Sequence, residues 1–108
     1  MVHPDRLADA TVMTAILDMI ERKSPDIFAA QIQAVLGRPD AAELLPAIAC
    51  PTLLLCGRDD AWSPFARHEA MARLMPGCRL VGIPDCGHMA TMERPEAVTA
   101  AMRDWLGR

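Results

Sequence analysis

Two turns that follow apolar stretches carry the side chains best suited to chemistry. His88 lies in a glycine-containing turn after the apolar run 80–83, and Asp60 lies in the turn after the apolar run 52–56. A carboxylate that accepts the Nδ1–H of a histidine leaves Nε2 free to act as a base, and it stabilises the imidazolium once that forms. Asp60 and His88 are therefore candidates for the acid and base of a catalytic site.

The spacing of these residues leaves other interpretations open. Paired aspartates after a strand are also typical of a solvated turn or a helix cap, and a histidine in a glycine turn is often structural. Asp59, Asp60, Cys86 and His88 could in principle ligate a metal, but their spacing fits no metal-binding pattern, so we expect no metal and no cofactor. Cys86 as a nucleophile for His88 is disfavoured, because side chains two residues apart rarely meet productively.

The second half of the chain must position these turns, and it predicts two strands and two helices. We expect strands at 52–56 and 78–83, helices at 64–75 and from Pro95 onward, and a loop at 84–94. Short, almost continuously apolar runs are typical of parallel strands covered on both faces. Ser63 followed by Pro64 is a helix-start signal. A βαβα unit of this kind has parallel strands and a right-handed crossover, which places both turns at one sheet edge.

The first part of the chain, residues 1–37, predicts two antiparallel helices. A helical period of apolar residues follows Asp5, a candidate cap, and a second period begins at Ser24 and stops at Gly37. The chain therefore divides into a helical segment, 1–37, and an α/β part, 38–108. Trp62, in the turn that carries Asp60, is expected to be buried or to line the entrance of a site.

The composition excludes several classes of partner. Eleven basic and fourteen acidic residues give a net charge of −3 without any basic run, which argues against nucleic-acid binding. No apolar run is long enough to span a bilayer, and the N-terminus lacks the pattern of a signal peptide. The four cysteines form no C-x-x-C pair, so we expect reduced thiols and a cytoplasmic protein.

Both turns, with their strands, resemble consecutive blocks of α/β-hydrolase fold proteins. The stretch 50–64 resembles the pattern P-T-L-x-x-x-G-x-x-D-x-x-x-P, and the stretch 83–98 resembles the last strand, Gly-His turn and final helix of that family. The blocks stand in the family's order and at its usual distance. The resemblance implies that Asp60 is the acid of a catalytic triad and His88 its base, with Asp59 as the second choice for the acid.

The family's nucleophile is missing from the sequence. It normally lies in a G-x-S-x-G elbow that precedes the acid and the base, whereas Ser24 and Ser63, the only serines, are not flanked by glycines. The resemblance therefore implies an incomplete α/β-hydrolase fold: the C-terminal portion of an enzyme that hydrolyses an ester or related carbonyl of a small molecule. Segment 1–37 would be the end of its lid region. Lacking both nucleophile and oxyanion hole, the chain alone should be inactive.

A two-stranded sheet also raises the question of a partner. Two parallel strands are not stable alone, and the bare edge of the strand at 52–56 invites pairing. We expect a homodimer or another pairing through this edge. A second hypothesis follows, in which the chain is a non-catalytic oligomerisation or interaction module and Asp60 and His88 are remnants of a hydrolase.

Overall fold

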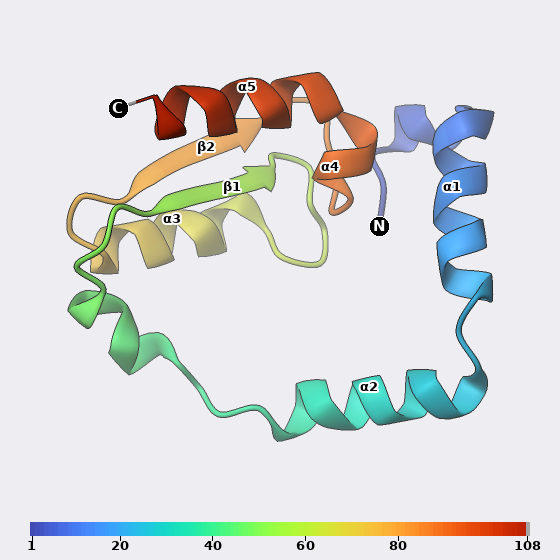
Figure 1. Cartoon of the computed structure of the whole chain (residues 1–108), viewed down its shortest axis with the longest axis horizontal. Coiled ribbons are helices and arrows are strands. Elements are labelled where there is room, and N and C mark those ends of the chain that lie inside the picture. The colour runs from blue at the N-terminus through green and yellow to red at the C-terminus, as the bar shows by residue number, and fades with distance from the viewer. Residues whose placement is uncertain (108) are drawn as a thin grey trace.

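A computed structural model describes residues 1–107 (Figure 1). Short 3-10 turns are named η. The elements are η1 (Pro4–Arg6), α1 (Ala10–Glu21), α2 (Pro25–Gly37), η2 (Ala42–Ala47), β1 (Leu53–Gly57), α3 (Phe65–Leu74), β2 (Arg79–Ile83), α4 (Ala90–Glu93) and α5 (Pro95–Leu106). The predicted succession of strand, helix, strand and helix is present in the second half of the chain, as expected for an incomplete α/β-hydrolase fold.

The two strands form a parallel pair, as predicted. Leu53 lies opposite Arg79 at one end of the pair, and Gly57 lies opposite Ile83 at the other. The helices α3 and α5 both contact both strands, and Figure 1 shows them on opposite sides of the sheet. The turns after β1 and β2 therefore leave the sheet at the same edge.

A small core lies under the turn that follows β2. Its buried residues are Ile83, Cys86 and Val98, and the partly buried residues packed against them are Leu55, Val81, Ala90 and Ala97. An ion pair between Arg79 and Asp104 joins the start of β2 to the end of α5. The turn that carries His88 thus rests on packed side chains rather than on a flexible support.

Local boundaries differ from the prediction where a side chain has a better partner. The cap of α1 is Asp9, which accepts the Val12 N–H, whereas Asp5 lies within η1. Pro64, and not the predicted Ser63, occupies the N-cap position of α3, and it has no polar side chain with which to cap the helix. The predicted loop 84–94 contains the short helix α4.

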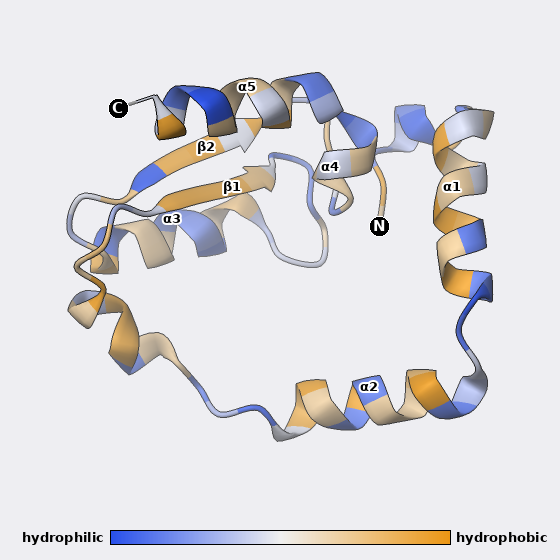
Figure 2. Cartoon of the chain, in the orientation of Figure 1, coloured by the Kyte–Doolittle hydropathy of each residue, from blue (hydrophilic) through white to orange (hydrophobic). Residues whose placement is uncertain are grey.

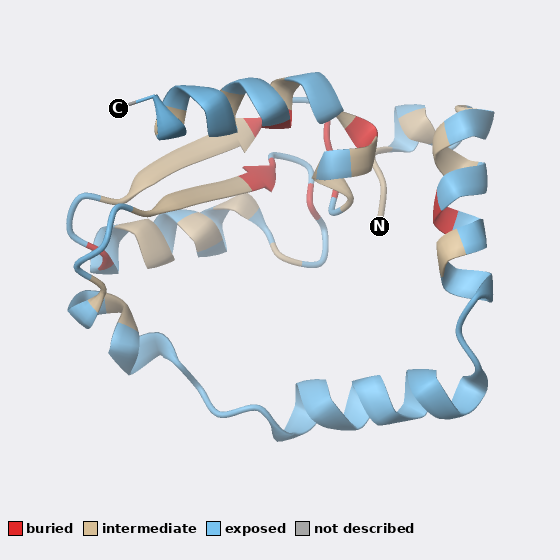
Figure 3. Ribbon diagram, in the orientation of Figure 1, coloured by how far each residue is buried: buried red, intermediate tan, exposed pale blue. Residues whose placement is uncertain are grey.

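The two N-terminal helices form, but they are not the antiparallel pair that we predicted. Figure 1 shows α1 and α2 meeting at a wide corner, with α2 far from the sheet. No residue of α2 is buried, as Figure 3 shows. Its large apolar residues are exposed: Ile27, Phe28, Ile32, Val35 and Leu36. The apolar patches are visible in Figure 2. The predicted helix is present, but these side chains remain exposed within residues 1–107.

The dimensions of the chain agree with this open arrangement. The Cα radius of gyration is 15.8 Å, whereas a compact domain of this length has one of about 13 Å. Within residues 1–107, no helix has both the length and the apolar character needed to cross a membrane.

Candidate active site

Asp60 and His88 meet at the carboxyl edge of the sheet. His88 Nδ1 lies 2.8 Å from Asp60 Oδ2; the Asp60 side chain is 4% exposed and the His88 side chain 40% exposed. A carboxylate can only accept, so this contact assigns the proton to Nδ1. Among residues 1–107, Nε2 has no hydrogen-bond partner, which leaves its lone pair open toward solvent.

The turn after β1 holds the Asp60 carboxylate in place. Its Oδ1 accepts the Trp62 N–H at 2.9 Å and the Ser63 N–H at 3.0 Å. Burial by itself raises the pKa of this carboxyl. The hydrogen bonds from Ser63, His88 and Trp62 outweigh burial and lower the pKa below its ordinary value. Asp60 is therefore ionised at neutral pH and oriented toward the imidazole.

Trp62 lies beside the imidazole rather than in the core. The prediction that it is buried is wrong, because its side chain is 63% exposed. The alternative, a place at the site, fits better: the ring centroids of Trp62 and His88 are 5.1 Å apart, with a tilt of 45°. Tilted aromatic contacts at this distance are favourable.

The glycines of the two turns are required for close packing. Neither Gly57 nor Gly87 has a positive φ, so neither position needs glycine for its backbone conformation. A Cβ on Gly57 would lie 2.2 Å from the carbonyl oxygens of both Cys86 and Gly87. The Asp59 N–H donates to the Cys86 carbonyl at 2.9 Å across this contact. Direct backbone contact thus sets how closely Asp60 approaches His88.

Cys86 and Asp59, the neighbours of the pair, do not take part in it. Cys86 is fully buried, and burial, followed by the charge of Glu93, raises the pKa of its thiol to about 11. A thiol with this pKa is protonated at neutral pH and is a poor nucleophile. The Asp59 carboxylate accepts the Cys86 N–H at 3.4 Å instead of contacting His88.

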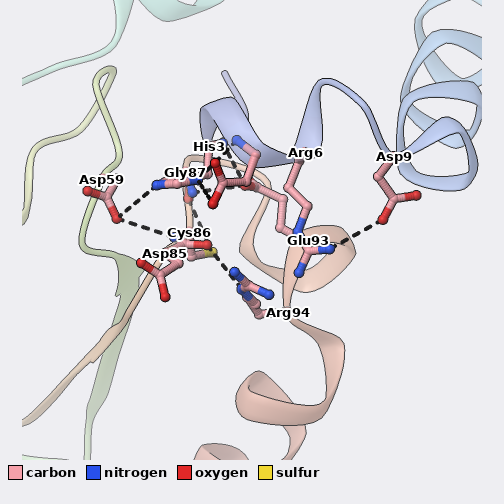
Figure 4. Close-up of polar contacts among 10 residues, drawn as sticks. His3, Arg6, Asp9, Asp59, Asp85, Cys86, Gly87, Glu93 and Arg94 are labelled. Carbon is pink, nitrogen blue, oxygen red and sulfur yellow. Dashed lines mark hydrogen bonds and ion pairs between the residues drawn. The ribbon is translucent and has the colours of Figure 1, made fainter.

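Two residues at the site were not identified from the sequence. Glu93 is 2% exposed and its carboxylate accepts backbone N–H groups from the turn that carries His88. His3, which is only 16% exposed, lies against the same turn (Figure 4). The only sequence signal for Glu93 is its position two residues before Pro95, and that signal is weak. No local pattern indicates that His3 lies at this edge of the sheet.

The possible metal ligands that lie close together in the structure are not the four residues considered from the sequence. Ligand atoms of His3, Asp59 and Asp85 lie within 4.8 Å of one another, while Asp60 and His88 bond to each other. His3 accepts the Asp5 N–H through Nδ1, which places its proton on Nε2, 3.8 Å from Asp59. These contacts account for the His3 and Asp59 side chains without a metal.

A hollow of about 500 Å³ lies on another part of the chain. Its lining residues come from the end of α2, the segment after it, η2 and α3: Val35, Arg38, Pro39, Asp40, Ala41, Ala42, Leu45, Arg67 and Met71. Neither member of the Asp60–His88 pair is among them. The hollow is therefore separate from the Asp60–His88 pair.

Comparison with known proteins supports a specific family. The sequence profile of the alpha/beta hydrolase family matches residues 2–101. The chain belongs to the alpha/beta hydrolase family. The resemblance stated for 50–64 and 83–98 is thereby confirmed, and so is the assignment of the fold.

Individual relatives of this alpha/beta hydrolase chain act on different compounds. A 2-hydroxy-6-oxononadienedioate/2-hydroxy-6-oxononatrienedioate hydrolase of Pseudomonas sp is 32% identical over 81 residues, covering 75% of this chain and 29% of that protein. A solved thermophilic esterase from Thermogutta terrifontis is 42% identical with a TM-score of 0.93, covering 99% of this chain and 40% of that one. A solved serine hydrolase involved in carbazole degradation is 27% identical with a TM-score of 0.68, covering 76% of this chain and 33% of that one.

The alpha/beta hydrolase chain therefore spans well under half the length of the relatives that it matches. Because the match to the Thermogutta esterase extends over nearly the whole chain, the wide placement of α1 and α2 is shared with that esterase. In the esterase, more than half of the polypeptide lies outside the match.

Proposed function

We propose that this chain supplies the acid and base of a Ser-His-Asp triad that hydrolyses esters or related carbonyl compounds. The nucleophilic serine and the oxyanion hole would come from a part of the enzyme that this sequence does not contain. The observation that carries the proposal is the 2.8 Å contact of Asp60 Oδ2 with His88 Nδ1, which leaves Nε2 open. The names of the relatives, an esterase and a serine hydrolase among them, support the same reaction class.

In the proposed reaction, each residue has a separate role. His88 Nε2 takes the proton of the serine hydroxyl as the oxygen attacks the carbonyl carbon, which produces a tetrahedral intermediate. The imidazolium then gives that proton to the leaving group, and the same cycle with water releases the acid. Asp60 keeps the proton on Nδ1 and stabilises the imidazolium with its charge. Its lowered pKa suits this role, because the carboxylate stays ionised throughout.

The test requires an enzyme in which the missing part is present. We define the completed enzyme as this chain joined to the part of the Thermogutta esterase that the match leaves out. Hydrolysis of a p-nitrophenyl ester should fall on the order of 10⁴-fold or more in His88→Ala, because the general base is lost. His68→Ala is the control: His68 lies on α3, and its Nδ1 approaches the Pro64 carbonyl.

Two outcomes would contradict the proposal. One is a completed enzyme that keeps its activity in His88→Ala but loses it in His68→Ala. The other is turnover of the ester by the isolated chain, abolished by His88→Ala, because it would show that no second part is needed. The isolated chain should give no turnover above the rate in buffer.

A second candidate function has one observation in its favour. The apolar residues of α2 are exposed and both strands have an unpaired outer edge within residues 1–107, so a second copy could cover these surfaces. In that case the chain is an oligomerisation or interaction module. Sedimentation equilibrium separates the two proposals. A stable homodimer without complementation by the remaining hydrolase part favours the module, whereas a monomer that becomes active on complementation favours the enzyme.

The intact mass of the natural gene product is a further discriminator. A product more than about twice this length would correspond to a complete fold of the family, since such a fold is near the upper range of single domains. A product of this length would favour the module.

A further inference from the structure

A buried carboxylate lies behind His88 and is not used in the mechanism above. Glu93 is 2% exposed, and none of the ion pairs among residues 1–107 includes it. Burying a charge without compensation is costly, so its partners indicate what it is there to hold. The close-up in Figure 4 shows the Glu93 side chain turned toward Gly87 and His3.

Three backbone N–H groups compensate the charge of Glu93. Oε1 accepts the His3 N–H at 2.7 Å and the Gly87 N–H at 3.0 Å, and Oε2 accepts the Met89 N–H at 3.0 Å. An ionised carboxylate accepts hydrogen bonds at both oxygens, and such charge-assisted bonds are stronger than neutral ones. Every protein hydrogen bond of this group in the described chain is thus to a peptide group.

Two of these three peptide groups flank His88 in the sequence. Gly87 precedes it and Met89 follows it, while the N–H of His88 itself donates to the Met1 carbonyl at 2.7 Å. Capping of α4 accounts for the contact with Met89, which is its N-cap residue, but not for the contact with Gly87. The arrangement therefore fixes the backbone from which the imidazole projects.

We propose that Glu93 is a positioning residue for His88: it anchors the peptide groups on either side, so that Nδ1–H stays directed at Asp60. The inference rests on the proposed role of His88 as the general base. It adds a residue outside the triad on which the orientation of that base depends. Its test can be made on this chain without any catalytic assay, because the tautomer of His88 is itself the readout.

Long-range ¹H–¹⁵N correlation spectra of the labelled chain report which ring nitrogen of His88 carries the proton. At mildly alkaline pH, the wild-type chain should show the Nδ1–H tautomer. In Glu93→Gln the shape is kept but the charge is lost, and we expect a mixture of tautomers. Amide exchange at Gly87 and Met89 should accelerate about tenfold or more, the loss expected for a hydrogen bond to a charged group. The Arg58 N–H, bonded to the Ile83 carbonyl, should exchange as in the wild type.

Glu69→Gln is the matched control, since Glu69 is an exposed residue of α3. It should leave both the tautomer and the exchange rates unchanged. The proposal is overturned if Glu93→Gln keeps the wild-type tautomer, or if exchange accelerates equally at Gly87, Met89 and Arg58, because a uniform effect indicates a general loss of stability.

A second variant covers the case in which Glu93→Gln does not fold. Glu93→Asp keeps the charge but withdraws the oxygens by one methylene, and it should also shift the tautomer balance of a folded chain. An unchanged tautomer in folded Glu93→Asp would overturn the proposal. Failure of both variants to fold would overturn it too, since Glu93 would then be a requirement of the whole fold.

The proposed function can fail separately from this inference. If His88→Ala leaves the completed enzyme active while Glu93→Gln alters the tautomer, the triad is wrong and the positioning role stands. If His88→Ala abolishes activity while Glu93→Gln leaves the tautomer unchanged, the triad stands and the positioning role is wrong.

Discussion

The α/β part around β1, β2 and α5 and the helix α2 are both rich in apolar residues, but these residues lie in opposite environments. In the α/β part, Ile83, Cys86 and Val98 bury one another, and the two catalytically suited turns touch through their backbones. In α2, the apolar stripe has no buried residue at all. An amphipathic pattern thus specifies a helix, whereas burial of its apolar face requires another segment that packs against it.

This difference has a consequence for function. The candidate site lies where the chain packs against itself, so the contact between Asp60 and His88 forms from residues of this chain alone. The exposed surface of α2, in contrast, needs another polypeptide segment to bury it. The Thermogutta esterase shares this placement of α2 and has more than half of its polypeptide outside the match. Substitutions in the two regions should therefore differ in how much they change the free energy of unfolding in urea.

The largest difference is expected between two glycines. Gly57→Ala places a Cβ 2.2 Å from two carbonyl oxygens, which cannot move without separating the turns, and we expect a loss of about 3 kcal/mol. At Gly37, the last residue of α2, a Cβ has nothing within 4 Å, so Gly37→Ala should be neutral or stabilising by up to about 1 kcal/mol. Equal effects at both positions would contradict the assignment of a packed and an unpacked region.

A smaller difference is expected between two apolar side chains. Val98→Ala removes part of the buried core and should cost about 2 kcal/mol. Phe28→Ser removes an aromatic ring that is 62% exposed, and the isolated chain should lose less than about 0.5 kcal/mol. A cost at Phe28 as large as that at Val98 would mean that α2 is already covered in solution, for example by a second copy.

The smallest expected effect is a dependence of stability on acid pH. An unfolded aspartate takes up its proton near pH 3.9, whereas the lowered pKa of Asp60 keeps the folded carboxylate ionised to lower pH. The unfolded chain then binds more protons, so stability is present above that pH and is lost as the pH falls toward the folded pKa. Urea titrations of Asp60→Asn should show a shallower loss below about pH 5 than the wild type.

Asp26→Asn is the control for this titration, because Asp26 is an exposed residue in the first turn of α2. It should keep the wild-type pH slope. A slope that disappears in Asp26→Asn rather than in Asp60→Asn would contradict the assigned origin.

The elements of the α/β part were predictable from the sequence because their signals are local. Short apolar runs, a Ser-Pro start and a glycine end predicted β1, α3, β2 and α5 within a residue or two. The contact between Asp60 and His88 followed, since parallel neighbours end at one edge. The placement of α2 was not predictable, because its apolar period indicates that a face is buried without saying by what.

The surroundings of the site were less accessible to sequence reasoning. Glu93 lies in the short helix α4, in a region predicted to be a loop. His3 reaches the His88 turn only through tertiary structure, since it is 90 residues from Glu93 in the sequence. The contact of the exposed Trp62 with the His88 imidazole is not encoded in any periodicity of the sequence. Contacts of this kind arise from tertiary structure.

The most direct test of the central claim compares the two adjacent aspartates by their kcat in the completed enzyme. Asp60→Asn should lower kcat roughly 10⁴-fold, because the amide can no longer hold the proton on Nδ1 or stabilise the imidazolium. Asp59→Asn should change kcat by less than about tenfold, since Asp59 has no contact with His88 among residues 1–107 and a substitution of this kind is mild. A large loss in Asp59→Asn together with near-normal activity in Asp60→Asn would contradict the account.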